Sequence, residues 1–181
     1  MLAAGYMAKR VSDSPEWLAA KQVVDIYSVS ACVSKNFADY ISYWKHNGYW
    51  LFDTPEVIQQ LARENAIDLE GTSLFYYEVY EREFDELAEA WRDFEPQSFP
   101  PRVIVPSQKV LAGYDVVSFT VGTNAECSPL SCGNLAEEVE TNSHCLLASL
   151  EQARQLLEVG TFADTEPGPF RVFAVYSVAW S

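Results

Sequence analysis

Three long stretches of the chain alternate between two sets of side chains with a period of two, which is typical of β-strands. They cover residues 73–83, 113–122 and 170–180. The last two are the most apolar, so we expect them at the centre of a sheet. A shorter alternating stretch at 23–34 predicts one more strand, with its more apolar face toward the core.

Two segments combine helical spacing of apolar residues with capping residues. At 53–66 an Asp-Thr-Pro sequence supplies the cap and the first helical residue,. At 149–160 Ser149 provides the cap and Gly160 the end of the helix,. Apolar residues three and four apart predict another helix at 37–44,.

The organisation of these elements predicts an α+β fold. We expect a single domain at 13–181, with a four- to five-stranded, mostly antiparallel sheet and two or three helices packed on one face. A mixed sheet is the alternative. The acidic segment at 84–94 is compatible with a helix, residues 1–12 with a flexible N-terminal tail, and no internal repeat is apparent.

Charge is the most uneven property of the sequence. The chain has 12 basic and 26 acidic residues, a formal net charge of −14. Residues 78–95 hold eight acids and two arginines, and residues 126–140 hold four glutamates and no base. A surface of this kind repels nucleic acid and anionic membranes and attracts basic partners. The alternative explanation is that the excess of acidic residues only keeps the protein soluble.

The chain shows no secretory leader and no apolar run near the roughly 20 residues that cross a bilayer,. We therefore expect a soluble, cytoplasmic protein that binds neither membrane nor nucleic acid directly. Its four cysteines are then expected as reduced thiols,.

The segment ECSPLSCGN and the following SHC offer candidate metal ligands. Zinc in proteins takes about four soft or imidazole ligands, with pairs close in sequence. The candidates are Cys127, Cys132, His144 and Cys145. Neighbours on a strand point to opposite faces, so only one of the last two would join a site. No cofactor is favoured by this loose spacing, with zinc as the minority possibility. In the alternative interpretation, the cysteines pack as small apolar residues around a turn.

The same segment offers a cysteine nucleophile. Cys127 or Cys132 would be activated by His144, with Glu137 orienting the imidazole ring,. The surrounding glutamates oppose this chemistry, because negative charge raises the pKa of a thiol. A metal-dependent or thiol enzyme is therefore an alternative function, and we expect binding more than catalysis.

Aromatic residues beside the acidic segment predict a docking surface. Tyrosine and tryptophan supply much of the binding energy of protein interfaces, and complementary charge speeds association. The candidate contacts are Tyr43, Trp44, Tyr49, Trp50, Glu81, Glu83, Asp85, Glu86 and Glu89. The leading hypothesis is an acidic protein-binding module, an inhibitor or neutraliser of a basic protein that acts on nucleic acid. A homodimer that uses the aromatic patch is a second alternative.

Overall fold

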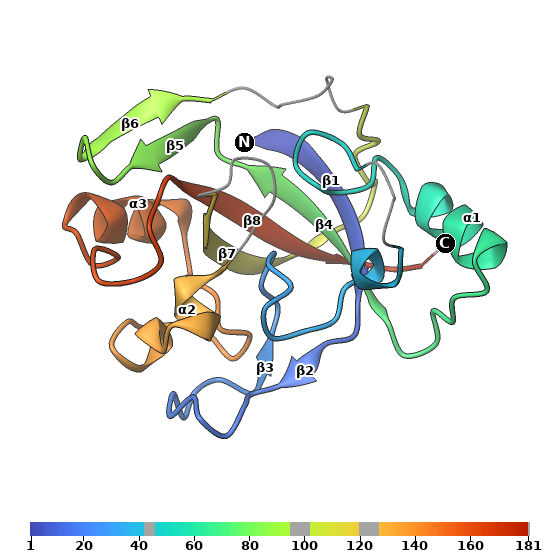
Figure 1. The fold of residues 1–181 in the computed structure, drawn as a ribbon, viewed down its shortest axis with the longest axis horizontal. Helices are drawn as coiled ribbons and strands as arrows, with labels where there is room; N and C mark the ends of the chain where they lie inside the picture. Colours follow the sequence, from blue (N-terminus) through green and yellow to red (C-terminus); the bar gives the residue numbers. More distant parts are fainter. Residues whose placement is uncertain (42–45, 95–101, 120–126, 181) are drawn as a thin grey trace.

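The fold is built on one antiparallel sheet of six strands (Figure 1). The computed structural model describes residues 1–41, 46–94, 102–119 and 127–180. The main strands are β1 (Leu2–Lys9), β4 (Ser73–Val79), β5 (Arg82–Asp85), β6 (Ala90–Asp93), β7 (Val110–Ser118) and β8 (Phe170–Val178). Strands β2 (Ser12–Asp13) and β3 (Asp25–Ile26) form a separate small pair. The α+β class is confirmed, with a strand count slightly larger than predicted.

β8 is the centre of the sheet, although it is the last strand of the chain. One edge of β8 pairs with β4, and the other edge pairs with β7. β5 continues along β8 at the pair Phe84–Phe170, and β6 completes a hairpin with β5. The predicted central place of the last strand is confirmed. The same prediction for 113–122 is wrong, because among the named strands of the described residues β7 pairs with β8 alone and its other edge makes only isolated bridges, to Leu147 and Cys127.

The two helices that carry caps in the sequence are confirmed. In α1 (Pro55–Glu64) the Thr54 hydroxyl accepts a hydrogen bond from the backbone N–H of Val57. In α3 (Leu150–Glu158) the Ser149 hydroxyl accepts one from Gln152. These two helices lie toward opposite ends of the sheet (Figure 1). The shorter helical elements are α2 (Pro129–Cys132), η1 (Phe37–Tyr40) and η2 (Leu135–Glu137).

The two halves of the sheet repeat one arrangement, which corrects the expectation of a chain without an internal repeat. β1 and β7 each contain an Ala-Gly-Tyr tripeptide, centred on Gly5 and Gly113. Both glycines follow a β-bulge and have positive φ, 137° and 152°. A Cβ atom would lie 2.7 Å from the Cβ of Leu51 at Gly5, and 2.7 Å from that of Leu146 at Gly113. Both positions therefore require glycine.

A loop with a central asparagine holds each bulge in place. The side-chain amide of the asparagine donates to the bulge carbonyl, and its oxygen accepts two N–H groups of its own loop. The partners are Ala4, Tyr49 and Leu51 for Asn47, and Ala112, His144 and Leu146 for Asn142. Three residues after each asparagine, Trp50 and Cys145 share a left-handed backbone with φ 60°. Each loop then leads into the capped helix of its half.

The strand register reveals a local twofold axis. Gly5 pairs with Tyr77 in β4, and Gly113 pairs with Val175 in β8, so these two residues are equivalent. Tyr77 and Val175 also pair with each other. When equivalent residues of two antiparallel strands are paired, a twofold axis passes between those two residues. Here it passes between Tyr77 of β4 and Val175 of β8. The first half is therefore β1–α1–β4, and the second half is β7–α3–β8.

Four further sequence predictions need correction. The predicted tail contains β1, whose residues 4–9 are all buried and pair with β4. The acidic segment 84–94 is the outer part of the β5–β6 hairpin instead of a helix, because Phe84 and Trp91 pack face to edge across it, 5.3 Å apart. Within 23–34 only Asp25–Ile26 forms a strand. At 37–44 the described part is the single turn η1.

Candidate functional site

A lysine and an aspartate are buried beneath the segment that was predicted as a strand at 23–34. Lys9 is 1% exposed, and its ammonium group donates to the backbone carbonyls of Ser28, Val29 and Ser30. All three ammonium donors are thereby used. Burial lowers the pKa of Lys9 to about 8, and the nearby Asp115 carboxylate opposes this shift.

Asp115 connects this segment to α2. Its Oδ2 atom accepts hydrogen bonds from the hydroxyl of Ser28 and the N–H of Val29, both at 2.8 Å. Its Oδ1 atom accepts one from the hydroxyl of Ser128, the residue before α2. Burial raises the pKa of Asp115, and the hydrogen bonds from Ser128, Val29 and Ser28 limit the shift. One carboxylate thus joins two segments that are about 100 residues apart.

Three cysteines lie on these two connected segments. Cys32 follows the segment bound to Lys9, and Cys127 and Cys132 flank Ser128. Their three sulfur atoms lie within 4.8 Å of one another, a spacing at which they could hold a metal ion. None of the chain's cysteines forms a disulfide. We call Cys32, Cys127 and Cys132 the thiol cluster.

The three thiols of the cluster shift one another's pKa. Hydrogen bonds from Cys127 and Cys132 lower the pKa of the Cys32 thiol. Contacts with Cys132 and Cys32 raise the pKa of Cys127. Cys32 is exposed and its two partners are half-buried, so the cluster opens toward solvent.

The structure brings together only two of the four ligands considered for zinc in the sequence. Cys127 and Cys132 belong to the thiol cluster, but His144 and Cys145 do not. His144 Nδ1 lies 2.6 Å from Asp25 Oδ1, and its ring stacks on Tyr27. The buried thiol of Cys145 contacts the carbonyl of Leu130. Among the described contacts, no cysteine pairs with His144.

The predicted orienting acid for a cysteine nucleophile also has another contact. Glu137 accepts a hydrogen bond from the backbone N–H of Ala19. Cys32, Lys9 and Asp115 were not among the residues predicted for a site. Asp115 carries the only local signal, because it is the one charged residue in the apolar strand β7.

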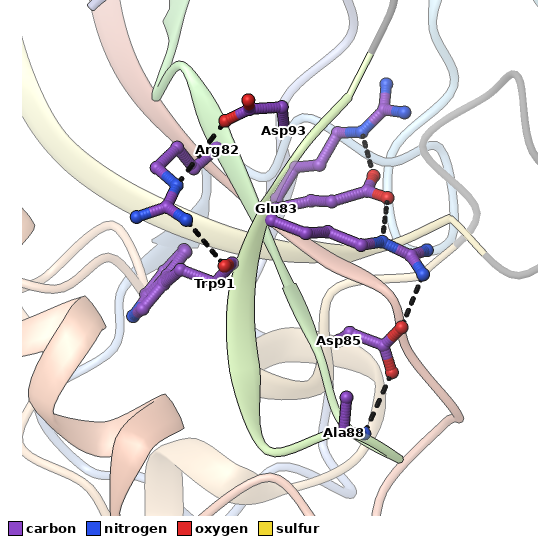
Figure 2. Close-up of polar contacts among 8 residues, drawn as sticks. Arg82, Glu83, Asp85, Ala88, Trp91 and Asp93 are labelled. Atoms are coloured by element: carbon purple, nitrogen blue, oxygen red, sulfur yellow. Dashed lines mark hydrogen bonds and ion pairs between the residues drawn. The ribbon is translucent and has the colours of Figure 1, made fainter.

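The acidic hairpin β5–β6 neutralises part of its own charge (Figure 2). Glu83 is 5% exposed and accepts hydrogen bonds from Arg92 at 2.8 Å and from Arg171 at 3.1 Å. Arg92 also pairs with Asp85. The guanidinium group of Arg171 stacks on Phe94. Glu83 is therefore an internal residue, which corrects its prediction as a docking contact.

A pocket of about 200 Å³ lies between the hairpin turn and the C-terminal end of α3. Its floor is apolar and is formed by Phe84, Leu157, Phe162 and Phe170. Glu86, Glu89 and Glu158 also line it, and the carboxylate of Glu158 pairs with Arg154 and accepts a hydrogen bond from Trp91. Beside it, Leu87 at the tip of the hairpin is 98% exposed. We call this feature the acidic pocket.

The predicted aromatic contacts have different environments. Tyr49 is 2% exposed and packs edge-on against Phe94, so it is a core residue and the docking prediction for it is corrected. Trp50 is 43% exposed and stacks on His46. Tyr43 and Trp44 lie outside the described residues. Of the predicted acids, Glu81 and Glu89 are exposed, and Asp85 and Glu86 are half-buried.

Comparisons of the chain with protein-family models, with curated proteins and with solved structures give no match. Among the described residues, no helix has the length and apolar character needed to span a bilayer.

Proposed function

We propose that this protein is an acidic, non-enzymatic binding module that docks on a basic surface of another protein. The acidic pocket is the observation that carries the proposal. A lysine or arginine side chain has an apolar stem and a charged head, so it matches a pocket that combines an apolar floor with carboxylates. Inhibition of a basic protein that acts on nucleic acid is the form of this function that the charge favours.

The charges around the acidic pocket support this assignment. Arg92, the arginine of the hairpin closest in sequence to the tip, is engaged by Glu83 and Asp85. Among the described contacts, Glu86 forms no ion pair with an arginine. Its carboxylate accepts a hydrogen bond from the N–H of Gly168. The exposed side chain of Leu87 adds apolar area for a partner to cover,.

Binding of a lysine-rich peptide, followed by calorimetry at several salt concentrations, tests the proposal. The double variant Glu86→Gln/Glu89→Gln should weaken binding by about 10-fold and reduce its dependence on salt. Glu64→Gln/Glu70→Gln changes the net charge equally on exposed residues at the α1 end, and should have little effect. If both variants weaken binding equally, the peptide is attracted by the net charge of the protein, and the acidic pocket is not its binding site.

A zinc centre is a second candidate function, favoured by the thiol cluster. Zinc is a borderline-soft ion that binds cysteine thiolates, and here three thiols converge,. This role is independent of the acidic pocket.

A further inference from the structure

We propose that the thiol cluster binds one thiophilic metal ion through Cys32, Cys127 and Cys132, with a fourth coordination position open toward solvent. The inference rests on the zinc role proposed above, and adds the ligand set, the open position and the residues that position the ligands. It differs from the sequence-based ligand set by including Cys32 and excluding His144 and Cys145.

The sulfur spacing suits such an ion. Zinc–sulfur bonds are about 2.3 Å long, which places tetrahedral ligand sulfurs about 3.8 Å apart. The three sulfurs lie within 4.8 Å of one another. Side-chain rotations that move each sulfur by less than about 1 Å would therefore complete the site. Oxygen-preferring ions such as magnesium do not match a donor set of sulfur alone.

The backbones of Cys127 and Cys132 are hydrogen-bonded to the fold, and Cys32 lies next to a hydrogen-bonded segment. The carbonyl of Cys127 accepts a hydrogen bond from Ser118 in β7 at 2.9 Å. The N–H of Cys132 donates to the carbonyl of Ser128 at 2.8 Å. Cys32 follows the three carbonyls that surround Lys9. Binding would therefore need little ordering of the chain, which favours affinity.

Lys9 and Asp115 act as positioning residues for the thiol cluster. Asp115 bonds to both segments that carry the cysteines, through Val29 and Ser128. A divalent ion with three thiolates has a net charge of −1, and the buried Lys9 ammonium group provides a nearby positive charge. Residues that support metal ligands in this way commonly affect metal affinity by about 10- to 100-fold.

The local twofold axis shows that the fold itself does not require this polar pair. The strand register makes Met7 the equivalent of Asp115, and Val117 the equivalent of Lys9. Both equivalents are apolar, and both are buried. Each pair of equivalent sheet positions thus holds one apolar and one charged side chain, with Lys9 in the first half and Asp115 in the second.

The fourth position is the chemically distinctive part of the site. Structural zinc is normally closed by four protein ligands, whereas three protein ligands leave room for water or another molecule. Among the described residues, the thiol cluster offers three ligands. Its exposed member is Cys32, so the fourth position faces solvent on that side. A small thiol or imidazole from solution can occupy such a position.

Titration of the reduced, metal-free chain with Zn²⁺ against a chromophoric chelator tests the proposal. We expect one zinc ion per chain, and loss of this binding in the triple variant Cys32→Ser/Cys127→Ser/Cys132→Ser. Cys145→Ser removes a cysteine outside the cluster and should bind like the wild type. Asp115→Asn keeps all four thiols and should bind about 10-fold more weakly or worse. Added imidazole should change the spectrum of the Co²⁺-substituted protein by entering the open position.

Alkylation of the wild-type protein keeps the test decisive if a variant fails to fold. Zinc should protect Cys32, Cys127 and Cys132 from iodoacetamide, as read by peptide mass spectrometry. The proposal is overturned if the wild type binds no stoichiometric zinc, if the triple variant binds as well, or if zinc protects none of the three. No partner is present in these measurements, so their outcome is independent of docking at the acidic pocket.

Discussion

Lys9 is bonded inside the fold to backbone carbonyl oxygens. Three carbonyls of one irregular segment converge on its ammonium group, which fixes a stretch of chain that has little secondary structure of its own. A buried charge is tolerated only when its hydrogen-bonding capacity is used. Lys9 thus connects β1 to the loop that carries Cys32.

Replacing Lys9 by methionine tests this view of the residue. Lys9→Met keeps a similar volume but leaves three carbonyls without their donor, and each unpaired buried acceptor costs about 1–3 kcal/mol. We expect the free energy of unfolding to fall by at least about 3 kcal/mol in urea denaturation. Lys35→Met, at an exposed lysine, should change it by less than about 0.5 kcal/mol,. Similar losses in the two variants would contradict the prediction.

His46 predicts a dependence of stability on pH. Its ring packs against Trp50 and Phe52, neither ring nitrogen has a described hydrogen-bond partner, and burial lowers its pKa from 6.5 to about 4. Below pH 6.5 the unfolded chain therefore binds a proton that the folded chain accepts only near pH 4. This lowers wild-type stability by about 3 kcal/mol as pH falls through that window.

The variant His46→Phe should lose this contribution. Relative to the wild type, its free energy of unfolding should increase as pH falls from 6.5 to 4, measured by denaturation at a series of pH values. Parallel curves for the two proteins would contradict the prediction, because they would show that the folded and unfolded chains protonate His46 equally.

Single residues also mark the limit of what the sequence could predict about the site. Cys127 and Cys132 are close in sequence and were considered together. Cys32 is about 95 positions away, and only the pairing of β1, β4, β8 and β7 brings its segment above Asp115. No local pattern records such a contact.

At the scale of elements, capping residues predicted α1 and α3 because they act within one turn of the chain. The β5–β6 hairpin was predicted wrongly for the opposite reason. Its sequence is rich in helix-forming alanine, leucine and glutamate, but the cross-strand pairs Phe84–Trp91 and Glu83–Arg92 favour the hairpin,. Tertiary contacts here outweigh local propensity.

The repeated asparagine loops give a prediction for two elements at once. The side chains of Asn47 and Asn142 each donate one hydrogen bond to a bulge and accept two from their own loop, and Asn47 also donates to Asp53. Asn47→Ala and Asn142→Ala should each lower the free energy of unfolding by about 2–3 kcal/mol, as buried partners lose their bonds. Asn65→Ala, at the exposed end of α1, should cost less than either. A small effect of one variant alone would show that the two loops differ in function.

At the scale of the whole molecule, the sheet depends on its last strand. β8 pairs with three other strands, and its alternation made its central place predictable from sequence. The strand order itself was not predictable, because it is set by contacts between distant segments. The acidic character of the protein was evident from composition, but which carboxylates face solvent became clear only from the fold.

Removal of β8 should therefore abolish folding. A chain that ends at Pro169 leaves β4 and β7 without their common neighbour, and we expect no cooperative unfolding transition and weak near-ultraviolet dichroism. A chain that ends at Val178 loses the Trp180–Thr72 hydrogen bond but keeps β8. It should fold, with stability reduced by about 1 kcal/mol. A cooperative transition in the shorter chain would contradict a central role for β8.

The axis between Tyr77 and Val175 relates the backbones of the two halves but not all of their side chains. Asp115 in the second half corresponds to Met7 in the first, and Lys9 in the first corresponds to Val117 in the second. A dimer of two identical halves would carry the same residue at both members of each pair. One lysine and one aspartate can therefore serve a single off-axis site only because the two halves belong to one chain and differ in sequence.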